Sequence, residues 1–139
     1  MDIWLVDEIN PWEVEEIPNQ DILFKRIPRA YFSDGILNTA AFHNIPRKTG
    51  GMSTDWSKHC NPRDTRRRSQ QKPPEEYAVV QLTVGEVRKI PDQTVVHAPI
   101  ASNRAHTEVF GEKHPEAHLQ FGRLVDRLGY VYRVDDPDI

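Results

Sequence analysis

The sequence predicts an α+β fold: one small domain in which a mixed or antiparallel sheet of three to five short strands packs against two or three helices on one side. The chain has 139 residues, the size of a single domain. Strand-like and helix-like segments alternate in its second half without an internal repeat, whereas the N-terminal half is rich in loops. A hydrophobic fraction of 37% and 11 prolines indicate a modest core surrounded by much irregular structure.

The composition divides the chain into an acidic arm, a domain and a short tail, at residues 1–19, 20–134 and 135–139. The arm carries Trp4, Leu5 and Trp12 among its acidic residues. Tryptophan side chains are large, apolar and seldom left in water. We therefore expect the arm to lie across its own domain or across a partner.

Few regular elements are predicted in the first half of the domain. Apolar residues over 21–29 indicate a short strand, with Ile22, Phe24 and, as a further candidate, Ile27 facing the core, and Lys25 and Arg26 facing out or sideways. Short helical turns are expected over 38–42 and, after a Ser-Thr-Asp cap, over 53–60. Residues 61–76 contain no apolar side chain, so no core face can be built from them, and we expect an exposed, mobile polar loop.

The second half begins with a β-branched run over 77–83 that predicts the clearest strand. Thr83, with Glu86 three positions later, resembles a capping box and predicts a helix that ends before Pro91. The following elements are expected to be a strand, a short helix, a long helix and a last strand, over 94–97, 103–110, 115–128 and 130–134.

The best candidate site lies between residues 94 and 111. A strand delivers His97 there, and Asn103 is placed to cap the helix that would carry Arg104 and His106. A helix N-terminus with arginine and histidine suits phosphate or carboxylate, which His97, Asn103 and Arg104 would bind. As an enzyme, the chain would use His97 and His106 for proton transfer and Arg104 to stabilise charge. The alternative is structural, with the histidines and the cap holding their own loop together.

Metal and thiol chemistry receive little support from the sequence. The spacing of His59, Cys60, His97 and His106 matches no standard zinc pattern, so we expect neither a metal nor another cofactor. Cys60 is the single cysteine, which excludes an intramolecular disulfide and fits a reducing compartment.

The polar loop over 61–76 carries a cluster of basic residues. Clustered arginines favour phosphate, so nucleic acid is one interpretation. A solvated loop is the preferred one, because no aromatic residue is interleaved for base stacking and acidic residues dilute the charge. The arginines concerned are Arg63, Arg66, Arg67 and Arg68.

The bulk charge excludes a protein drawn as a whole to nucleic acid or to an acidic membrane. The net charge is −3 at pH 7. The acidic N-terminus lacks the basic and apolar segments of a secretory signal. No apolar run approaches the ~20 residues that span a bilayer. We therefore expect a cytoplasmic protein without a membrane partner.

A recurring pattern links several of these segments. It comprises Asp34-Gly35, Ala41-Phe42, the Ser-x-Asp of residues 53–55, the His-x-Pro that begins at His97, and the Asn-x-Ala-His over 103–106 that leads to Gly111. The pattern resembles small uncharacterised bacterial proteins over residues 20–113. The resemblance implies a bacterial, cytoplasmic protein with one coherent domain, and it carries no activity.

Two functions of different classes remain open. The first is a protein-binding component of a bacterial multi-protein system, anchored through Trp4, Leu5 and Trp12, since aromatic residues commonly anchor interfaces. The second is a metal-independent, RNase-like enzyme that acts on a phosphodiester or nucleotide with His97 and His106. The first is preferred, because no recognised catalytic motif is present, so the sequence leaves enzymatic activity undecided.

Overall fold

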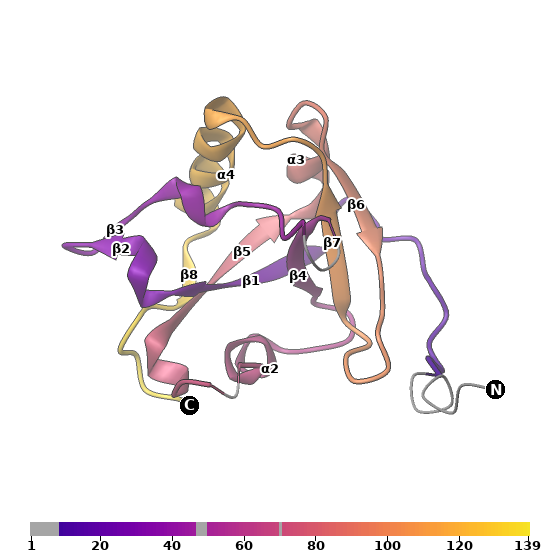
Figure 1. The fold of residues 1–139 in the computed structure, drawn as a ribbon, viewed down its shortest axis with the longest axis horizontal. Coiled ribbons are helices and arrows are strands. Elements are labelled where there is room, and N and C mark those ends of the chain that lie inside the picture. The colour runs from indigo at the N-terminus through magenta and orange to yellow at the C-terminus, as the bar shows by residue number, and fades with distance from the viewer. Residues whose placement is uncertain (1–8, 47–49, 70) are drawn as a thin grey trace.

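The computed structural model of the chain describes residues 9–46, 50–69 and 71–139. Within these residues, six strands form one antiparallel sheet and two others form a separate hairpin (Figure 1). The strands of the sheet are β1 (Ile22–Pro28), β4 (Met52–Trp56), β5 (Tyr77–Thr83), β6 (Thr94–His97), β7 (His106–Phe110) and β8 (Tyr130–Tyr132). Their order across the sheet is β6-β7-β4-β1-β5-β8. The hairpin consists of β2 (Phe32–Ser33) and β3 (Ile36–Leu37).

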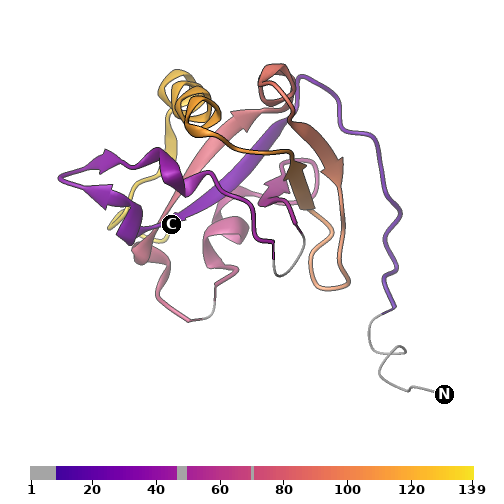
Figure 2. The same ribbon diagram turned by 45° about the horizontal axis from the view of Figure 1, so that its top comes forward.

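Helices cover both faces of the sheet. The α-helices are α2 (Pro62–Arg67), α3 (Val84–Lys89) and α4 (Pro115–Leu128), and the 3-10 turns are η1 (Arg29–Tyr31), η2 (Thr39–Ala41) and η3 (Pro74–Glu76). Figure 2 shows α3 and α4 on one face and α2 on the other. The predicted α+β class and the single small domain are confirmed. Six strands in the described part exceed the predicted three to five, and the helices are not confined to one side.

Two segments predicted as helical are strands. The first half of the turn expected over 53–60 lies in β4, and most of the helix expected over 103–110 lies in β7. β7 pairs with β6 on one side and with β4 on the other. Ile100 and Asn103 exchange backbone hydrogen bonds of 3.1 and 2.9 Å, so Asn103 lies in a tight turn instead of capping a helix. Pairing on both sides of β7 outweighs the weak helical preference of so short a segment.

The main core lies between the sheet and the layer of α3 and α4. Leu23 and Ile27 enter it from β1, and Phe121 enters it from α4. Phe42, which follows η2, stacks on Phe121 with ring centroids 5.2 Å apart. The first and last thirds of the chain are thereby joined in one core.

The side chains of β1 alternate in the opposite phase to the prediction. The core contains Leu23 and Ile27, whereas Phe24 lies on the other face, opposite Asp55 of β4. Phe24 is nonetheless buried, because α2 packs against β1 from that side. A strand that is covered on both faces carries apolar side chains on both. The spacing of its apolar residues therefore does not show which face lies toward the main core. The prediction that Ile22 and Phe24 face the core is therefore wrong.

The other predicted helices are confirmed. η2, α3 and α4 form where the sequence placed them. α4 begins at Pro115 and stops before Gly129, whose φ of 77° is a conformation that favours glycine. Thr83 precedes α3 as predicted, but its side chain makes no capping hydrogen bond. In the described residues, no helix combines the length and the apolar composition that crossing a bilayer requires.

The polar segment over 61–76 differs from the mobile loop that was expected. Asn61 and Asp64 form a reciprocal capping box that starts α2. Arg66 is fully buried, and its guanidinium donates to three backbone carbonyl oxygens. A buried arginine thus provides the inward contact that apolar residues usually provide, since its five donors can satisfy carbonyl groups that would otherwise lack partners.

Candidate functional site

The sheet register separates the two histidines of the predicted site. His97 on β6 pairs with Thr107, and His106 on β7 pairs with Asp55. Successive side chains of a strand point to opposite faces. His97 therefore lies on the face that carries the core, and His106 lies on the face that carries α2. The structure does not place the two imidazoles on one side of the sheet, where a single substrate could meet both.

Both ring nitrogens of His97 are already occupied. Nδ1 accepts the backbone N–H of Glu15 at 2.9 Å, and Nε2 donates to the carbonyl oxygen of Arg104 at 2.7 Å. A neutral imidazole has one donor and one acceptor, so the ring is saturated. The residue is 2% exposed, and its ring meets Trp56 edge-on at 5.1 Å. His97 ties the N-terminal arm and the β6–β7 turn to the sheet.

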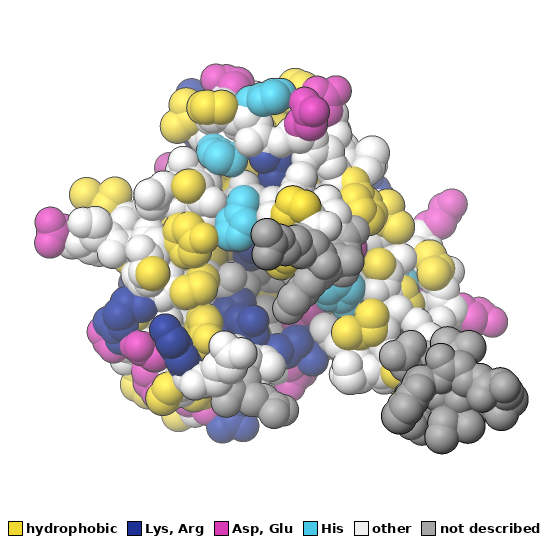
Figure 3. Space-filling view, in the orientation of Figure 1, with side chains coloured by type: hydrophobic (Ala, Val, Ile, Leu, Met, Phe, Trp, Pro, Cys, Tyr) yellow, Lys and Arg dark blue, Asp and Glu magenta, His cyan; other side chains and the backbone are white. Residues whose placement is uncertain are grey.

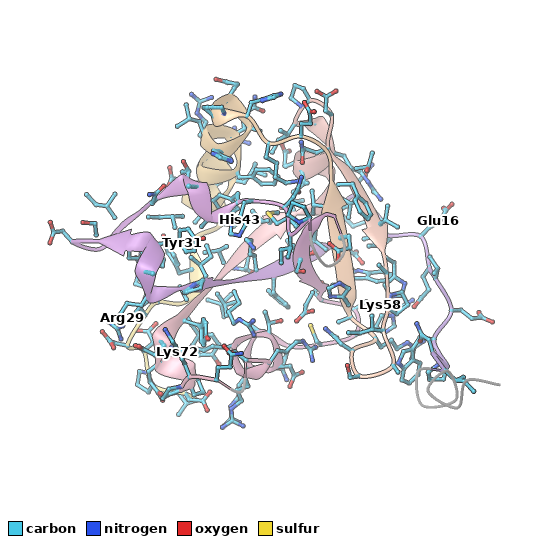
Figure 4. All side chains as sticks on the ribbon, in the orientation of Figure 1. Glu16, Arg29, Tyr31, His43, Lys58 and Lys72 are labelled. Carbon is cyan, nitrogen blue, oxygen red and sulfur yellow. The ribbon has the colours of Figure 1, made fainter. Side chains whose placement is uncertain are left out.

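Glu15 holds the arm through a cluster that we name the clasp, formed by Glu15, Lys58, His59 and His97. The Glu15 carboxylate lies 2.5 Å from Lys58 Nζ and 2.5 Å from His59 Nε2. Hydrogen bonds from Lys58 and His59 lower the pKa of Glu15 from 4.5 to about 2. Lys58 lies on the same side of the molecule as the arm that carries Glu16 (Figure 4).

The clasp contains a set of groups that zinc commonly uses. Ligand atoms of Glu15, His59 and His97 lie within 4.8 Å of one another. In this arrangement they bond to each other, because His97 accepts from Glu15 and the Glu15 carboxylate accepts from His59. The cations of Lys58 and Arg104 also approach Glu15, at 2.5 and 3.8 Å. These hydrogen bonds and ion pairs connect the N-terminal arm to the rest of the domain.

Trp12 packs against its own domain. Its Nε1 donates to the carbonyl oxygen of Ala101 at 3.4 Å, and the guanidinium of Arg104 lies 4.9 Å from its ring. Arg104 and Trp12 are thus engaged with each other. The other predicted partner anchors, Trp4 and Leu5, lie outside the described residues. Docking of the arm to a partner stays a prediction.

Asn103 is held inside a buried network around Asp55. Its amide donates to Asp55 at 2.8 Å, and its side-chain oxygen accepts the backbone N–H of Ala105 at 3.0 Å. The second oxygen of Asp55 accepts from Thr65 at 2.7 Å and from Arg68 at 2.5 Å. This network joins α2, β4 and the β6–β7 turn. Asn103 therefore has a structural task.

The arginines predicted to contact nucleic acid have acceptors within the chain. Arg66 is buried, as described above, and Arg68 donates to Asp55. Arg63 and Arg67 both lie within ion-pair distance of Asp138 in the C-terminal tail. These pairs explain how a segment with so many like charges forms a helix, and the nucleic-acid contact stays a prediction without support from this geometry.

An open cleft lies between α2 and the loop after η2, where the pairing of β1 with β4 ends. Its volume is about 1080 Å³. β1, β4 and β7 form its floor, and its walls come from α2, the loop after η2 and the β6–β7 turn. Lys and Arg side chains gather on this part of the surface in Figure 3. The floor residues are Phe24, Lys25, Arg26, Ser53, Thr54, Asp55 and His106.

The lining of the cleft is basic although the whole chain carries a net charge of −3. The acidic side chains in the lining are Asp55 and Asp64, and Asp55 is bound by Arg68. The cations are more numerous, namely Lys25, Arg26, Arg67, Arg68 and Arg104. The positive character is therefore local, and it does not follow from the overall composition.

Lys25 is the unusual residue of this lining. It lies on β1 between Leu23 and Ile27 of the core, directly after the two residues through which β1 pairs with β4. The side chain is 9% exposed, and its amine has no hydrogen-bond partner among the described residues. Burial lowers the pKa of Lys25 from 10.5 to about 8, and the positive charges of Arg26 and Lys113 act in the same direction.

His106 and Glu108 form a pair at the end of the cleft. His106 Nε2 lies 2.9 Å from Glu108 Oε1 and donates to it, which leaves the lone pair on Nδ1. Glu108 is 1% exposed, and its Oε2 has no hydrogen-bond partner in the part of the chain that the structure describes. His106 lines the cleft, whereas Glu108 lies behind it against Gly51. A buried carboxylate thus orients an imidazole toward the cleft.

Sequence reasoning singled out His106 but missed Lys25 and Glu108. The sequence signal for Lys25 is its position between Leu23 and Ile27, two apolar residues that share its face of the strand. The prediction that Ile22 and Phe24 face the core assigned Lys25 to the wrong face. Residues two apart share a face of a strand but not of a helix. The helix expected over 103–110 would place His106 and Glu108 on different faces, so it does not predict their pairing.

Comparison of the chain with protein-family models, with curated protein sequences and with solved structures gives no match in any of the three. The resemblance to small bacterial proteins accordingly stays a prediction, and function must be inferred from the cleft itself.

Proposed function

We propose that the protein is a binding module for a small phosphate-bearing ligand, which it holds in the cleft through Lys25 and Arg26. The observation that carries the proposal is Lys25, a largely buried residue of the cleft lining whose amine has no hydrogen-bond acceptor among the described residues. A largely buried cation without a partner is unfavourable. An anionic ligand would supply the missing acceptor.

Arg26 supports the choice of phosphate. Its guanidinium lies 4.9 Å from the ring of Tyr77, and it too has no hydrogen-bond acceptor among the described residues. Arginine donors match phosphate oxygens in a bidentate arrangement, and a nearby lysine adds a point charge. Lys25 and Arg26 both line the cleft, although their side chains leave opposite faces of β1.

The size of the cleft supports a ligand larger than free phosphate. Sites for small molecules usually enclose roughly 300–1,000 Å³, and this cleft has about 1080 Å³. Apolar and aromatic side chains in the lining, including Phe24, Tyr31 and Ile45, offer contacts to an uncharged part of such a ligand. We therefore propose a phosphate group attached to an organic body.

The proposal is tested by calorimetric titration with adenosine monophosphate and with adenosine, which differ only in the phosphate. We expect the monophosphate to bind and adenosine to bind at least tenfold more weakly. Substitution of Lys25→Met should weaken binding of the monophosphate by roughly ten- to a hundredfold, because a charge-assisted hydrogen bond contributes about 1.5–3 kcal/mol.

The matched control is Lys89→Met, which removes the same charge from an exposed position on α3. Lys89 does not line the cleft, so binding should be unchanged apart from a small loss of long-range attraction. Equal binding of the two ligands, or equal loss in the Lys25 and Lys89 variants, contradicts the proposal.

A further inference from the structure

We infer that the cleft also catalyses hydrolysis of phosphodiesters, with His106 as the general base and Glu108 as the residue that positions it. This inference rests on the proposed phosphate site and assigns it a reaction. It replaces the predicted partnership of His97 and His106 by a partnership of His106 with Arg26, which lies on the same face of the sheet.

His106 is oriented by Glu108. The 2.9 Å hydrogen bond from Nε2 to Glu108 leaves Nδ1 as the acceptor of the ring, and Nδ1 has no partner among the described residues. The side chain of His106 is 14% exposed and lines the cleft. An imidazole held by a carboxylate on one nitrogen and open on the other is the arrangement that general-base catalysis requires.

Only one of the two carboxylate oxygens of Glu108 has a hydrogen-bond partner among the described residues. Its Oε2 atom is buried without a hydrogen-bond partner among the described residues, although Glu108 lies on the same face as Ser53, its partner across the strands. A buried oxygen left in this state is unfavourable for folding. A carboxylate whose only described bond is to His106 increases the ability of that imidazole to take up a proton, since it stabilises the resulting imidazolium.

Arg26 and His106 lie on the same face of the sheet, because Phe24, two positions before Arg26, pairs with Asp55, and Asp55 pairs with His106. One strand, β4, separates β1 from β7, so the strand axes are about two strand spacings, or roughly 10 Å, apart. Both residues line the cleft. A phosphodiester held by the arginine, with a water molecule on its far side, spans this separation.

Water is the only co-reactant that the hydrolysis needs. His106 Nδ1 accepts one proton from water while the water oxygen forms a bond to phosphorus. The bond from phosphorus to one ester oxygen breaks, and the leaving alkoxide takes a proton from solvent. The products are a phosphate monoester and an alcohol, and the imidazolium returns its proton to solvent. Lys25 and Arg26 stabilise the negative charge on the phosphoryl oxygens throughout.

The test uses bis(p-nitrophenyl) phosphate, whose hydrolysis releases coloured p-nitrophenolate. We expect the full chain to hydrolyse it, and His106→Gln to lower kcat by roughly a hundredfold or more. Glutamine can still donate to Glu108, so this variant should fold, which its thermal unfolding checks.

Glu108→Gln separates positioning from a merely structural role. The amide oxygen can still accept from His106 Nε2, but the negative charge is lost. We expect kcat to fall by roughly tenfold with KM unchanged, and the fall in rate at acid pH, where imidazole is protonated, to shift along the pH axis. In His106→Gln, that acid limb should be absent.

The outcomes distinguish this inference from the proposed function. Binding of adenosine monophosphate without hydrolysis of the diester overturns the catalytic inference and leaves the binding function standing. Absence of both binding and hydrolysis overturns both. Hydrolysis that survives in His106→Gln shows that another group acts as the base and overturns the role of His106.

Discussion

The clasp and the cleft contain the same kinds of side chain and meet at His59, which lines the cleft, but they differ in how completely those side chains are bonded. In the clasp, both nitrogens of His97 are occupied, and the Glu15 carboxylate meets two cations. In the cleft, one nitrogen of His106, one oxygen of Glu108 and the amine of Lys25 have no described partner.

This difference separates structural from functional polar groups better than residue type does. A buried polar group that finds its partners within the chain stabilises the fold. A buried polar group that lacks them makes folding less favourable and marks a candidate position for a ligand or a reaction. His97 belongs to the first kind, whereas Glu108 Oε2 and Gln93 Oε1 belong to the second in the described residues. Of these two, Glu108 bonds to a residue of the cleft lining, His106.

The largest expected effect comes from breaking the clasp at His97. The change His97→Ala leaves the Glu15 N–H and the Arg104 carbonyl without partners and opens a cavity beside Trp56. We expect a loss of about 3 kcal/mol in the free energy of unfolding, measured by urea denaturation. The control His114→Ala alters an exposed histidine and should change stability by less than about 0.5 kcal/mol. Similar effects of the two changes would contradict the structural assignment of His97.

The change Lys25→Met in the cleft should act in the opposite direction. The pKa of Lys25 is lower in the folded protein, about 8, than its ordinary value of 10.5. The unfolded chain therefore binds more protons between these two values, and the stability of the unchanged protein rises with pH across that window. Below pH 8 the buried ammonium destabilises the fold. We expect the variant to be more stable by on the order of 2–3 kcal/mol at neutral pH.

The pH dependence supplies the check on Lys25. Urea denaturation between pH 7 and pH 10.5 should show a smaller rise in stability for Lys25→Met than for the unchanged protein. Some rise should remain, because burial also lowers the pKa of Lys113 to about 8. Lys89→Met should retain the full slope. A variant that is less stable than the unchanged protein at neutral pH would show that the amine is well accommodated, and it would weaken the case for a missing ligand.

Local sequence signals were sufficient for α3, α4 and β5, whose proline and glycine boundaries, apolar periodicity and β-branched residues agree with their final structure. They failed for β4 and β7, because what makes those segments extended is pairing with strands far away in the chain. Residue Arg66 shows a second reason. Its guanidinium is buried by carbonyl groups about 70 residues distant, and no local pattern indicates that a polar helix will be anchored in this way.

The candidate site was predictable in part for the same reason. The sequence indicates His106 as a candidate because of its residue type. Its hydrogen-bond partner and the face to which its side chain points depend on the strand register, which a helix prediction for this segment cannot give. Lys25 lies in a strand that was predicted, and its burial follows from cover on both faces of the sheet. Side-chain chemistry is therefore visible in the sequence, whereas completeness of bonding requires the three-dimensional structure.

The smallest expected effect concerns the acid sensitivity of the clasp. The pKa of Glu15 is about 2 in the folded protein, against 4.5 ordinarily, so its carboxylate stabilises the fold above pH 4.5, and this contribution is lost as the pH falls toward 2. The variant Glu15→Gln should lose stability near neutral pH and show a shallower acid limb in urea denaturation. Glu13→Gln removes a carboxylate that forms no ion pair among the described residues, and it should retain the limb. If both variants lose stability with acid as the wild-type protein does, Glu15 does not contribute to the acid sensitivity of the fold. The difference in bonding between the clasp and the cleft would then be supported only by His97 and by the cleft residues.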